Sequence, residues 1–188
     1  VLDGADRAPV RRRSHLQIHE GVAPEGGLIV YGTQGEAPDN QAAKDAALAL
    51  AERLKRFKGL TLPIKADVEL TPDERRKSLV LIGRPGVNAL ATEWSDQFPV
   101  RFIRGQAPGG ETFPAVDGKA LWWQGRAFTQ PDQGVVQIVA NPLKPEQTVL
   151  MFAGLGPRAQ ADALRFTQRA GTFAVFGGPG VLEEGTAL

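Results

Sequence analysis

The sequence predicts an α/β protein with a mostly parallel central sheet covered by helices. Residues 27–35, GLIVYGTQG, form a short apolar run between glycines, which is typical of a strand buried on both faces. The next segment, to about residue 58, has apolar residues at helical spacing. A strand, a glycine turn and a helix form the opening unit of a doubly wound domain.

Composition excludes several classes of protein. The chain has 188 residues, enough for one domain with a sizeable core, and its 42% hydrophobic and 23% charged residues are typical of globular proteins. Its 22 Lys and Arg residues against 21 Asp and Glu give a net charge of +1. We therefore expect no nucleic acid as a partner. No apolar run approaches the roughly 20 residues of a transmembrane helix, so we expect no membrane insertion.

The two ends of the chain are expected to lie outside the core. Residues 1–26 read as a lead-in or linker, in which residues 14–19, SHLQIH, alternate as a short half-exposed strand does. Residues 27–178 form the predicted α/β domain, and residues 179–188 a loosely held tail. Because Val1 is not an initiator methionine, we expect a processed protein or a piece of a longer chain.

The first half of the domain follows the strand and helix pattern. Residues 38–58 place five apolar residues on one helical face, and Gly59 stands where a C-cap is expected. Residues 62–68 read as a second strand, and Thr71-Pro72-Asp73-Glu74 is a strong start signal for a short helix. The apolar residues of the first helix are Ala43, Ala47, Leu50, Leu54 and Phe57.

The second half begins with the clearest buried strand, residues 79–83, and a helix with Leu90, Trp94 and Phe98 on one face. Shorter β-like pieces follow at 100–103 and 120–123. Strands at 134–140 and 148–153 are joined by too few residues for a crossover helix, so they should be antiparallel. A helix from Gly156 carrying Ala159, Ala163, Phe166 and Ala170 and a final strand at 172–177 complete the pattern. It predicts a Rossmann-like or flavodoxin-like three-layer sandwich with one antiparallel hairpin.

Three glycine turns follow predicted strands and are the candidate ligand site. In open α/β sheets the carboxyl ends of the strands bind ligands, and helix N-termini there favour anions. Arginine adds forked donors suited to phosphate or carboxylate. The alternative is that the glycines only permit tight reversals, since no turn matches a nucleotide-binding motif. The candidate residues are Gly32, Thr33, Gln34, Gly83, Arg84, Asn88, Gly154 and Arg158.

The sequence offers few residues that could serve in catalysis or bind a metal ion. The chain has no cysteine, and Ser14, Ser78 and Ser95 stand outside any G-x-S-x-G elbow. The two histidines, His15 and His19, both lie in the lead-in, where a metal site is not expected. Paired carboxylates have ready roles at caps and strand faces. We assign no catalytic residue, metal or cofactor.

Trp122 and Trp123 are the candidate aromatic surface. Adjacent residues of a strand point to opposite faces, so one of these indoles is expected in the core. The other is a platform for a sugar or a partner surface, or merely covers a loop.

Several segments resemble the Rossmann-like or flavodoxin-like domain that accompanies the α/β-hydrolase unit in large secreted bacterial hydrolases of the prolyl-oligopeptidase or esterase type. The likeness spans most of residues 14–154 and contains no catalytic signature. It implies an extracytoplasmic, non-catalytic accessory role, with another domain or chain such as an α/β-hydrolase unit as the partner. The matching pieces are LIVYGT (28–33), DNQA (39–42), LPIKAD (62–67), TPDE (71–74), LVLIGRPGVN (79–88), FPVRF (98–102) and NPLKP (141–145).

The sequence therefore leaves three hypotheses. The chain is an accessory or interaction domain, or a binder or enzyme for a small anionic or nucleotide-like ligand at the glycine turns. The third and weaker hypothesis is a carbohydrate-binding module that uses Trp122 or Trp123.

Overall fold

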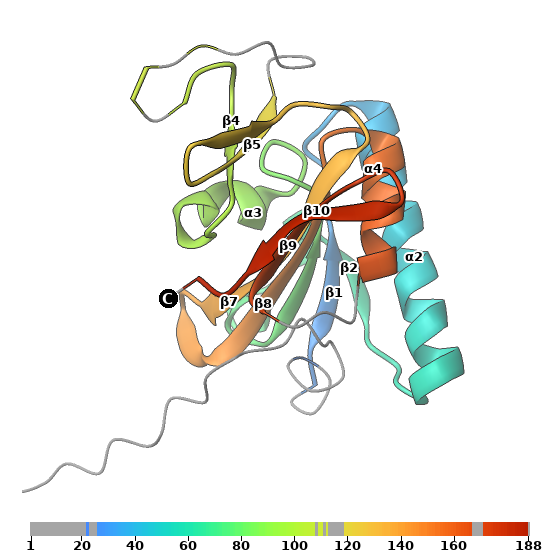
Figure 1. The fold of residues 1–188 in the computed structure, drawn as a ribbon. Helices are drawn as coiled ribbons and strands as arrows, with labels where there is room; N and C mark the ends of the chain where they lie inside the picture. Colours follow the sequence, from blue (N-terminus) through green and yellow to red (C-terminus); the bar gives the residue numbers. More distant parts are fainter. Residues whose placement is uncertain are drawn as a thin grey trace, which may run out of the picture.

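A computed structural model describes residues 22, 26–107, 109–110, 112, 119–166 and 171–187. The predicted strand at 14–19, both histidines and Ala170 lie outside these residues. A seven-stranded sheet forms the centre of the described part (Figure 1). In spatial order its strands are β10 (Gly180–Gly185), β9 (Phe173–Gly177), β7 (Gln133–Asn141), β8 (Lys144–Gly154), β3 (Leu79–Ile82), β1 (Leu28–Tyr31) and β2 (Ile64–Ala66).

The predicted buried runs lie side by side in this sheet. Strands β2, β1, β3 and β8 are parallel to one another, with Ile29 opposite Val80 and Val80 opposite Leu150. All four residues of β3 are buried. The apolar runs near residues 28, 80, 136, 150 and 174 thus occupy neighbouring strands, because a strand covered on both faces needs apolar side chains on both.

The other half of the sheet is antiparallel. Strands β7 and β8 form the predicted hairpin, and β9 and β10 continue the antiparallel pairing. The sheet is therefore mixed rather than mostly parallel. The prediction of a loose tail from residue 179 was wrong, since β10 pairs with β9 along its length. A turn at Gly178, with φ of +55°, lets the chain reverse and supply hydrogen-bond partners for the outer edge of β9.

Helices and a second sheet cover the two faces of the large sheet (Figure 1). Helices α2 (Ala37–Lys58) and α4 (Pro157–Asp162) pack together on one face. On the other face lie the short helix α3 (Ala89–Glu93) and a three-stranded antiparallel sheet. That sheet consists of β4 (Arg101–Ile103), β5 (Ala120–Trp123) and β6 (Arg126–Phe128). The 3₁₀ turns are η2 (Asp67–Glu69), η3 (Glu74–Arg76), η4 (Ser95–Gln97) and η6 (Ala163–Phe166).

Each face has its own apolar core. On the α2 face, Leu50 packs among the side chains of Ile29, Val80 and Phe152. The opposite core contains residues of α3 and the small sheet packed on the same strands. Its members include Leu90, Trp94, Phe98, Leu121 and Phe128 beside Val30, Leu81, Met151 and Val175. Leu90, Trp94 and Phe98 share a core as predicted, although only Leu90 lies in α3: Trp94 is its C-cap, and Phe98 follows a 3₁₀ turn.

Helix α2 follows the prediction closely except in its last turn. Its bounds differ by one residue, and Gly59 caps it with φ of +65°. Phe57, however, is 69% exposed. A helix of 22 residues is about 33 Å long, whereas the strands it covers have three or four residues and span about 13 Å at most. The end of α2 therefore projects beyond β1, β2 and β3.

Gln137 ties the small sheet to the large one. It lies in the middle of β7, is fully buried, and forms two hydrogen bonds with the backbone of Val100. Its Oε1 accepts from the Val100 N–H at 3.0 Å, and its Nε2 donates to the Val100 carbonyl at 3.1 Å. Because Val100 immediately precedes β4, this amide fixes where β4 crosses the sheet.

Gly32 should tolerate no side chain. A Cβ at this position would lie 2.4 Å from the Val87 carbonyl oxygen, a backbone atom that cannot turn away. We expect Gly32→Ala to lower the free energy of unfolding by about 1–3 kcal/mol, as other overpacked sites do. Gly180→Ala is the matched control, because a Cβ there meets nothing within 4 Å. Urea unfolding of both variants checks this, and equal stabilities would contradict the close approach.

Candidate functional site

The ends of β1 and β3 form a topological switch point. After β1 the chain enters α2 on one face of the sheet, and after β3 it enters α3 on the other face. The two connecting loops, residues 32–36 and 83–88, therefore diverge from neighbouring strand ends. Such a divergence opens the crevice in which open α/β sheets bind ligands.

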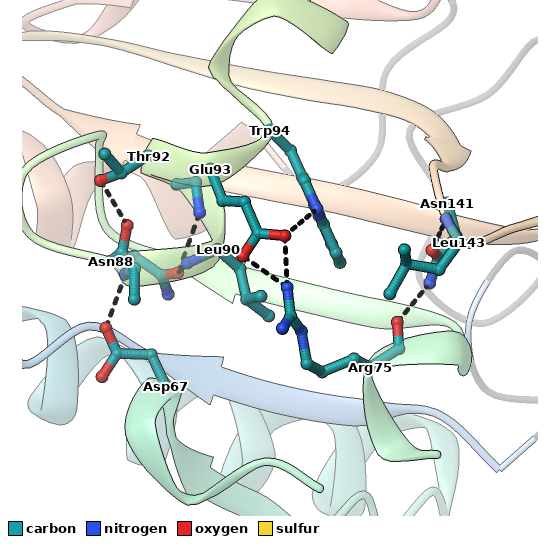
Figure 2. Close-up of polar contacts among 11 residues, drawn as sticks. Asp67, Arg75, Asn88, Leu90, Thr92, Glu93, Trp94, Asn141 and Leu143 are labelled. Atoms are coloured by element: carbon teal, nitrogen blue, oxygen red, sulfur yellow. Dashed lines mark hydrogen bonds and ion pairs between the residues drawn. The ribbon is translucent and has the colours of Figure 1, made fainter. Parts of the chain in front are cut away.

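Asn88 holds the two strand ends together from beneath this crevice. Its side chain is fully buried, and its Nδ2 donates to the carbonyls of Val30 at 3.1 Å and Ile82 at 3.3 Å. Its Oδ1 accepts from the N–H groups of Leu90 and Ala91, which caps α3 (Figure 2). Asn88, predicted as a ligand residue, thus uses both ends of its amide within the fold.

Thr33 is engaged in a similar way. Its hydroxyl donates to Oδ1 of Asp67 at 2.6 Å, and Oδ2 of Asp67 accepts from the N–H of Ala89 at 2.7 Å. Asp67 follows β2 and is 6% exposed. One carboxylate therefore connects the exits of β1 and β2 with the start of α3.

Asn40 fixes the loop between β1 and α2. Its Nδ2 donates to the carbonyls of Thr33 and Gly35, and its Oδ1 accepts from the Gly35 N–H at 2.8 Å. Asn40 lies in the first turn of α2, so the loop is fastened to the helix that it precedes.

A second set of contacts braces α3 on its far side. Arg75 donates to both carboxylate oxygens of Glu93, and its guanidinium lies 5.8 Å from the centre of the Trp94 ring (Figure 2). Asn141 Nδ2 donates to the carbonyl of Arg75 at 2.9 Å. The β2–β3 connection is thereby joined to α3 and to the β7–β8 turn.

A cleft of about 570 Å³ lies at this switch point. Four segments line it: the β1 exit with the start of α2, the β3 exit with α3, the end of β4, and the residue before β5. The described lining residues are Gln34, Gly35, Glu36, Asp39, Arg84, Pro85, Gly86, Thr92, Phe102, Ile103, Arg104 and Lys119.

Arg84 is the most deeply buried charge of the cleft, at 4% exposure. Its Nη2 donates to Oδ2 of Asp39 at 2.6 Å, an ion pair between the β3 exit and the first turn of α2. Its Nε is buried and has no hydrogen-bond partner among the described residues. An unsatisfied buried donor costs about 1–3 kcal/mol, and the Nε of Arg75, outside the described lining of the cleft, is in the same state.

The remaining walls combine charge with apolar surface. Arg104 and Lys119 contribute positive charge, and Glu36 contributes a negative charge beside Asp39. Pro85, Phe102 and Ile103 are the apolar residues of the lining, and Phe102 also packs against the core of this face. The cleft can therefore receive a molecule that has both a charged and an apolar part.

The predicted site residues divide into three groups. Gln34 and Arg84 line the cleft. Gly32, Thr33, Gly83 and Asn88 belong to the same loops but serve the fold: Gly32 allows close approach of Val87, and Gly83 has φ of +115°. For these two glycines, the alternative interpretation as permissive turn residues has the support of the geometry.

Gly154 and Arg158 form the third group, and neither is among the described lining residues of the cleft. Gln160 closes their turn, because its Oε1 accepts from the Gly154 N–H and its Nε2 donates to the Phe152 carbonyl. A Cβ at Gly154 would lie 2.2 Å from the backbone nitrogen of Gln160. Helix α4 therefore lies directly against this strand exit, and Arg158 is exposed.

The tryptophan pair divides as strand geometry requires. Trp123 packs toward the large sheet, with its ring centre 4.5 Å from that of Phe173. Both indoles are half-buried, and Trp122 stands opposite Arg101 and Ala127 in the neighbouring strands. A role for Trp122 as a binding surface stays a prediction.

Sequence reasoning missed the β4 side of the cleft. Phe102, Ile103 and Arg104 come from a three-residue strand, and Lys119 precedes another short one. No motif marks these residues, because they reach the cleft only through the packing of the small sheet on the large one. The position of Asp39 four residues after Gly35 is the one local signal for a helix-start carboxylate near the turn.

Comparison of the chain with models of known protein families and with curated proteins finds no match. Among the described residues, no group of three or more His, Cys, Asp and Glu side chains is placed to hold a metal ion. No helix in the described ranges is long and apolar enough to cross a membrane.

The pKa of the Glu74 carboxyl group lies well below its ordinary value. Lys65 donates to its carboxylate at 2.7 Å and Thr71 supplies backbone and hydroxyl bonds, which together lower the Glu74 pKa from 4.5 to about 2. Thr71 and Glu74 form the predicted capping box, although the helix it opens is a single 3₁₀ turn.

Asn88 and Gln34 both have amide side chains and were both predicted to bind a ligand, but Asn88 is buried and Gln34 is exposed. Comparing their alanine variants tests which of the two stabilises the fold. We expect Asn88→Ala to lower the free energy of unfolding by about 2–4 kcal/mol, because it removes a helix cap and two hydrogen bonds to buried carbonyls. Gln34 is exposed, so Gln34→Ala should change stability by less than about 0.5 kcal/mol. Chemical denaturation measures both, and a mild Asn88 variant would refute the structural role.

Glu74 should stabilise the fold above its unfolded pKa and lose this effect in acid. Since its folded pKa is depressed, its contribution is complete above about pH 4.5 and disappears as the pH falls toward 2. The stability difference between the wild type and Glu74→Gln should therefore shrink across that window in urea titrations. In a Lys65→Met background the same substitution should matter less, and an unchanged difference there would contradict the assigned cause.

Proposed function

We propose that this chain is a small-molecule-binding domain whose ligand occupies the cleft between the exits of β1 and β3. The observation that supports this is the position of the cleft, since α2 and α3 leave these adjacent strands on opposite faces of the sheet. Ligands in open α/β sheets bind at such a point. A volume of about 570 Å³ lies within the range of small-molecule sites.

The hydrogen bonds beneath the cleft favour binding to a preformed site. Asn40, Asp67 and Asn88 hold the loops through bonds to backbone groups, so little conformational entropy is left to lose when a ligand enters. The residues that face the cleft, by contrast, offer a guanidinium, two further cations and an apolar wall.

The strand order supports assigning the parallel half to the flavodoxin-like group of folds. In that group the second strand lies on one side of the first and the third on the other, as β2, β1 and β3 do here. Strands β7, β9 and β10 and the small sheet are additions to this unit. We propose the Rossmann-like or flavodoxin-like assignment on this order.

A second candidate is an accessory domain of a larger secreted hydrolase-type protein, with an α/β-hydrolase unit as the partner. The resemblance over residues 14–154 supports it. So does the rigid bonding of the strand exits, in which Asn88 and Gln160 direct their amides to backbone groups of the domain itself. A scaffold has this property. The two candidates are compatible, because an accessory domain can also bind a ligand.

Thermal unfolding with a panel of nucleotides, flavins, organic acids and sugars tests the binding function. A ligand at one hundred times its Kd adds about 2.7 kcal/mol to stability, which for a chain of this size raises the Tm by roughly 5–10 °C. Ile103→Trp, which fills the cleft from β4, should abolish the shift. Leu182→Trp on exposed β10 is the control and should retain it. A panel without any stabilising compound favours the accessory role alone, and a shift that survives Ile103→Trp places the ligand elsewhere.

A further inference from the structure

The floor of the cleft contains a guanidinium that the fold satisfies only in part. Arg84 is buried, its Nη2 donates to Asp39, and its Nε has no hydrogen-bond partner among the described residues. The Nε–H and one Nη2–H point from the same edge of the guanidinium plane. A carboxylate or phosphate group binds that edge with two oxygens. Asp39 accepts from Nη2, a nitrogen that an external anion on this edge would also use.

Charge on the other walls also favours an anion. Asp39 balances Arg84, which leaves Arg104 and Lys119 against Glu36 among the described lining residues. A cleft with an excess of one charge concentrates ligands of the opposite charge. Pro85, Phe102 and Ile103 provide an apolar surface beside these cations.

Asp39 has a second favourable environment. It lies in the first turn of α2, where the helix dipole stabilises a carboxylate. Displacement from Arg84 therefore does not leave Asp39 as an unstabilised buried charge, and its side chain is 15% exposed already in the pair. The ion pair can open without disrupting the helix.

We propose that the ligand is an organic anion, a carboxylate or phosphate group joined to a flat apolar group, and that its anionic group binds Arg84 in competition with Asp39. The proposal rests on the proposed function, that the cleft is the ligand site. Arg84 holds the anion with two hydrogen bonds, Arg104 and Lys119 attract it, and Pro85 and Ile103 contact the apolar group. Without a ligand, Asp39 accepts the hydrogen bond from Nη2 of Arg84. The strength of this ion pair therefore limits the affinity of Arg84 for the anion.

Matched pairs of acid and neutral compound test the ligand class. The probes are indole-3-acetate against indole-3-acetamide and adenosine monophosphate against adenosine, titrated by ligand-observed NMR and calorimetry. We expect one acid to bind at least tenfold more tightly than its neutral partner, and more weakly as salt rises. The carboxylate and phosphate pairs show which anionic group the cleft takes.

Variants of the ion pair test the competition. Asp39→Asn removes the competing charge at equal size and should tighten binding of the acid about three- to tenfold. Arg84→Lys keeps the charge but loses the fork and should weaken binding at least tenfold. Arg104→Gln should weaken it several-fold and keeps the test valid if the Arg84 variant fails to fold. Arg158→Gln, an exposed arginine away from the described lining of the cleft, is the control and should bind as the wild type does.

The outcomes separate this proposal from the function on which it rests. A neutral compound that binds as tightly as its acid, and loses binding in Ile103→Trp, overturns the anion proposal and leaves the cleft as the site. Weaker binding in Asp39→Asn overturns the competition. Failure of both acids to bind either the wild type or Asp39→Asn overturns the proposed ligand class, whereas the binding function is overturned only when the whole thermal-unfolding panel gives no shift.

Discussion

The geometry of the switch point depends on the buried amide of Asn88. With one side chain it supplies donors to the carbonyls of Val30 and Ile82 and acceptors to the first N–H groups of α3. Parallel neighbours β1 and β3 end together, with the Gly32 N–H still bonded to the Ile82 carbonyl, yet their connections leave on opposite faces. The buried asparagine adds a side-chain donor to a carbonyl of each strand at this divergence. The loop that carries it then packs so closely on Gly32 that no Cβ fits there.

The same principle recurs around the sheet. Asn40 holds the loop before α2, Asp67 joins the β2 exit to α3, and Gln160 closes the β8 exit against α4. Each is a polar side chain that satisfies backbone groups where a strand ends. The strand-exit edge is thus held by polar side chains, and Arg84 at the β3 exit has a buried donor without a partner in the described part of the chain, as Arg75 does elsewhere.

The Arg84–Asp39 pair connects stability with binding. It joins the β3 exit to α2, but a buried ion pair is weak evidence for stability, because desolvation offsets much of the attraction. Its position at the floor of a cleft gives it a second use. A pair that contributes little net stability can exchange one partner for a ligand at small cost, and the helix dipole at the start of α2 reduces that cost further.

Local pattern alone determined the elements of this protein: the α2 helix with its Gly59 cap, the buried runs that became β1, β3, β7, β8 and β9, and the antiparallel β7–β8 hairpin. These depend on periodicity and turn length, which neighbouring residues set. Only tertiary structure decided that β10 completes the sheet, that Phe57 lies outside the core, and that Phe102, Arg104 and Lys119 line the same cleft as Arg84. Such contacts join segments distant in the chain, and short strands of low apolar content carry no local signal for them.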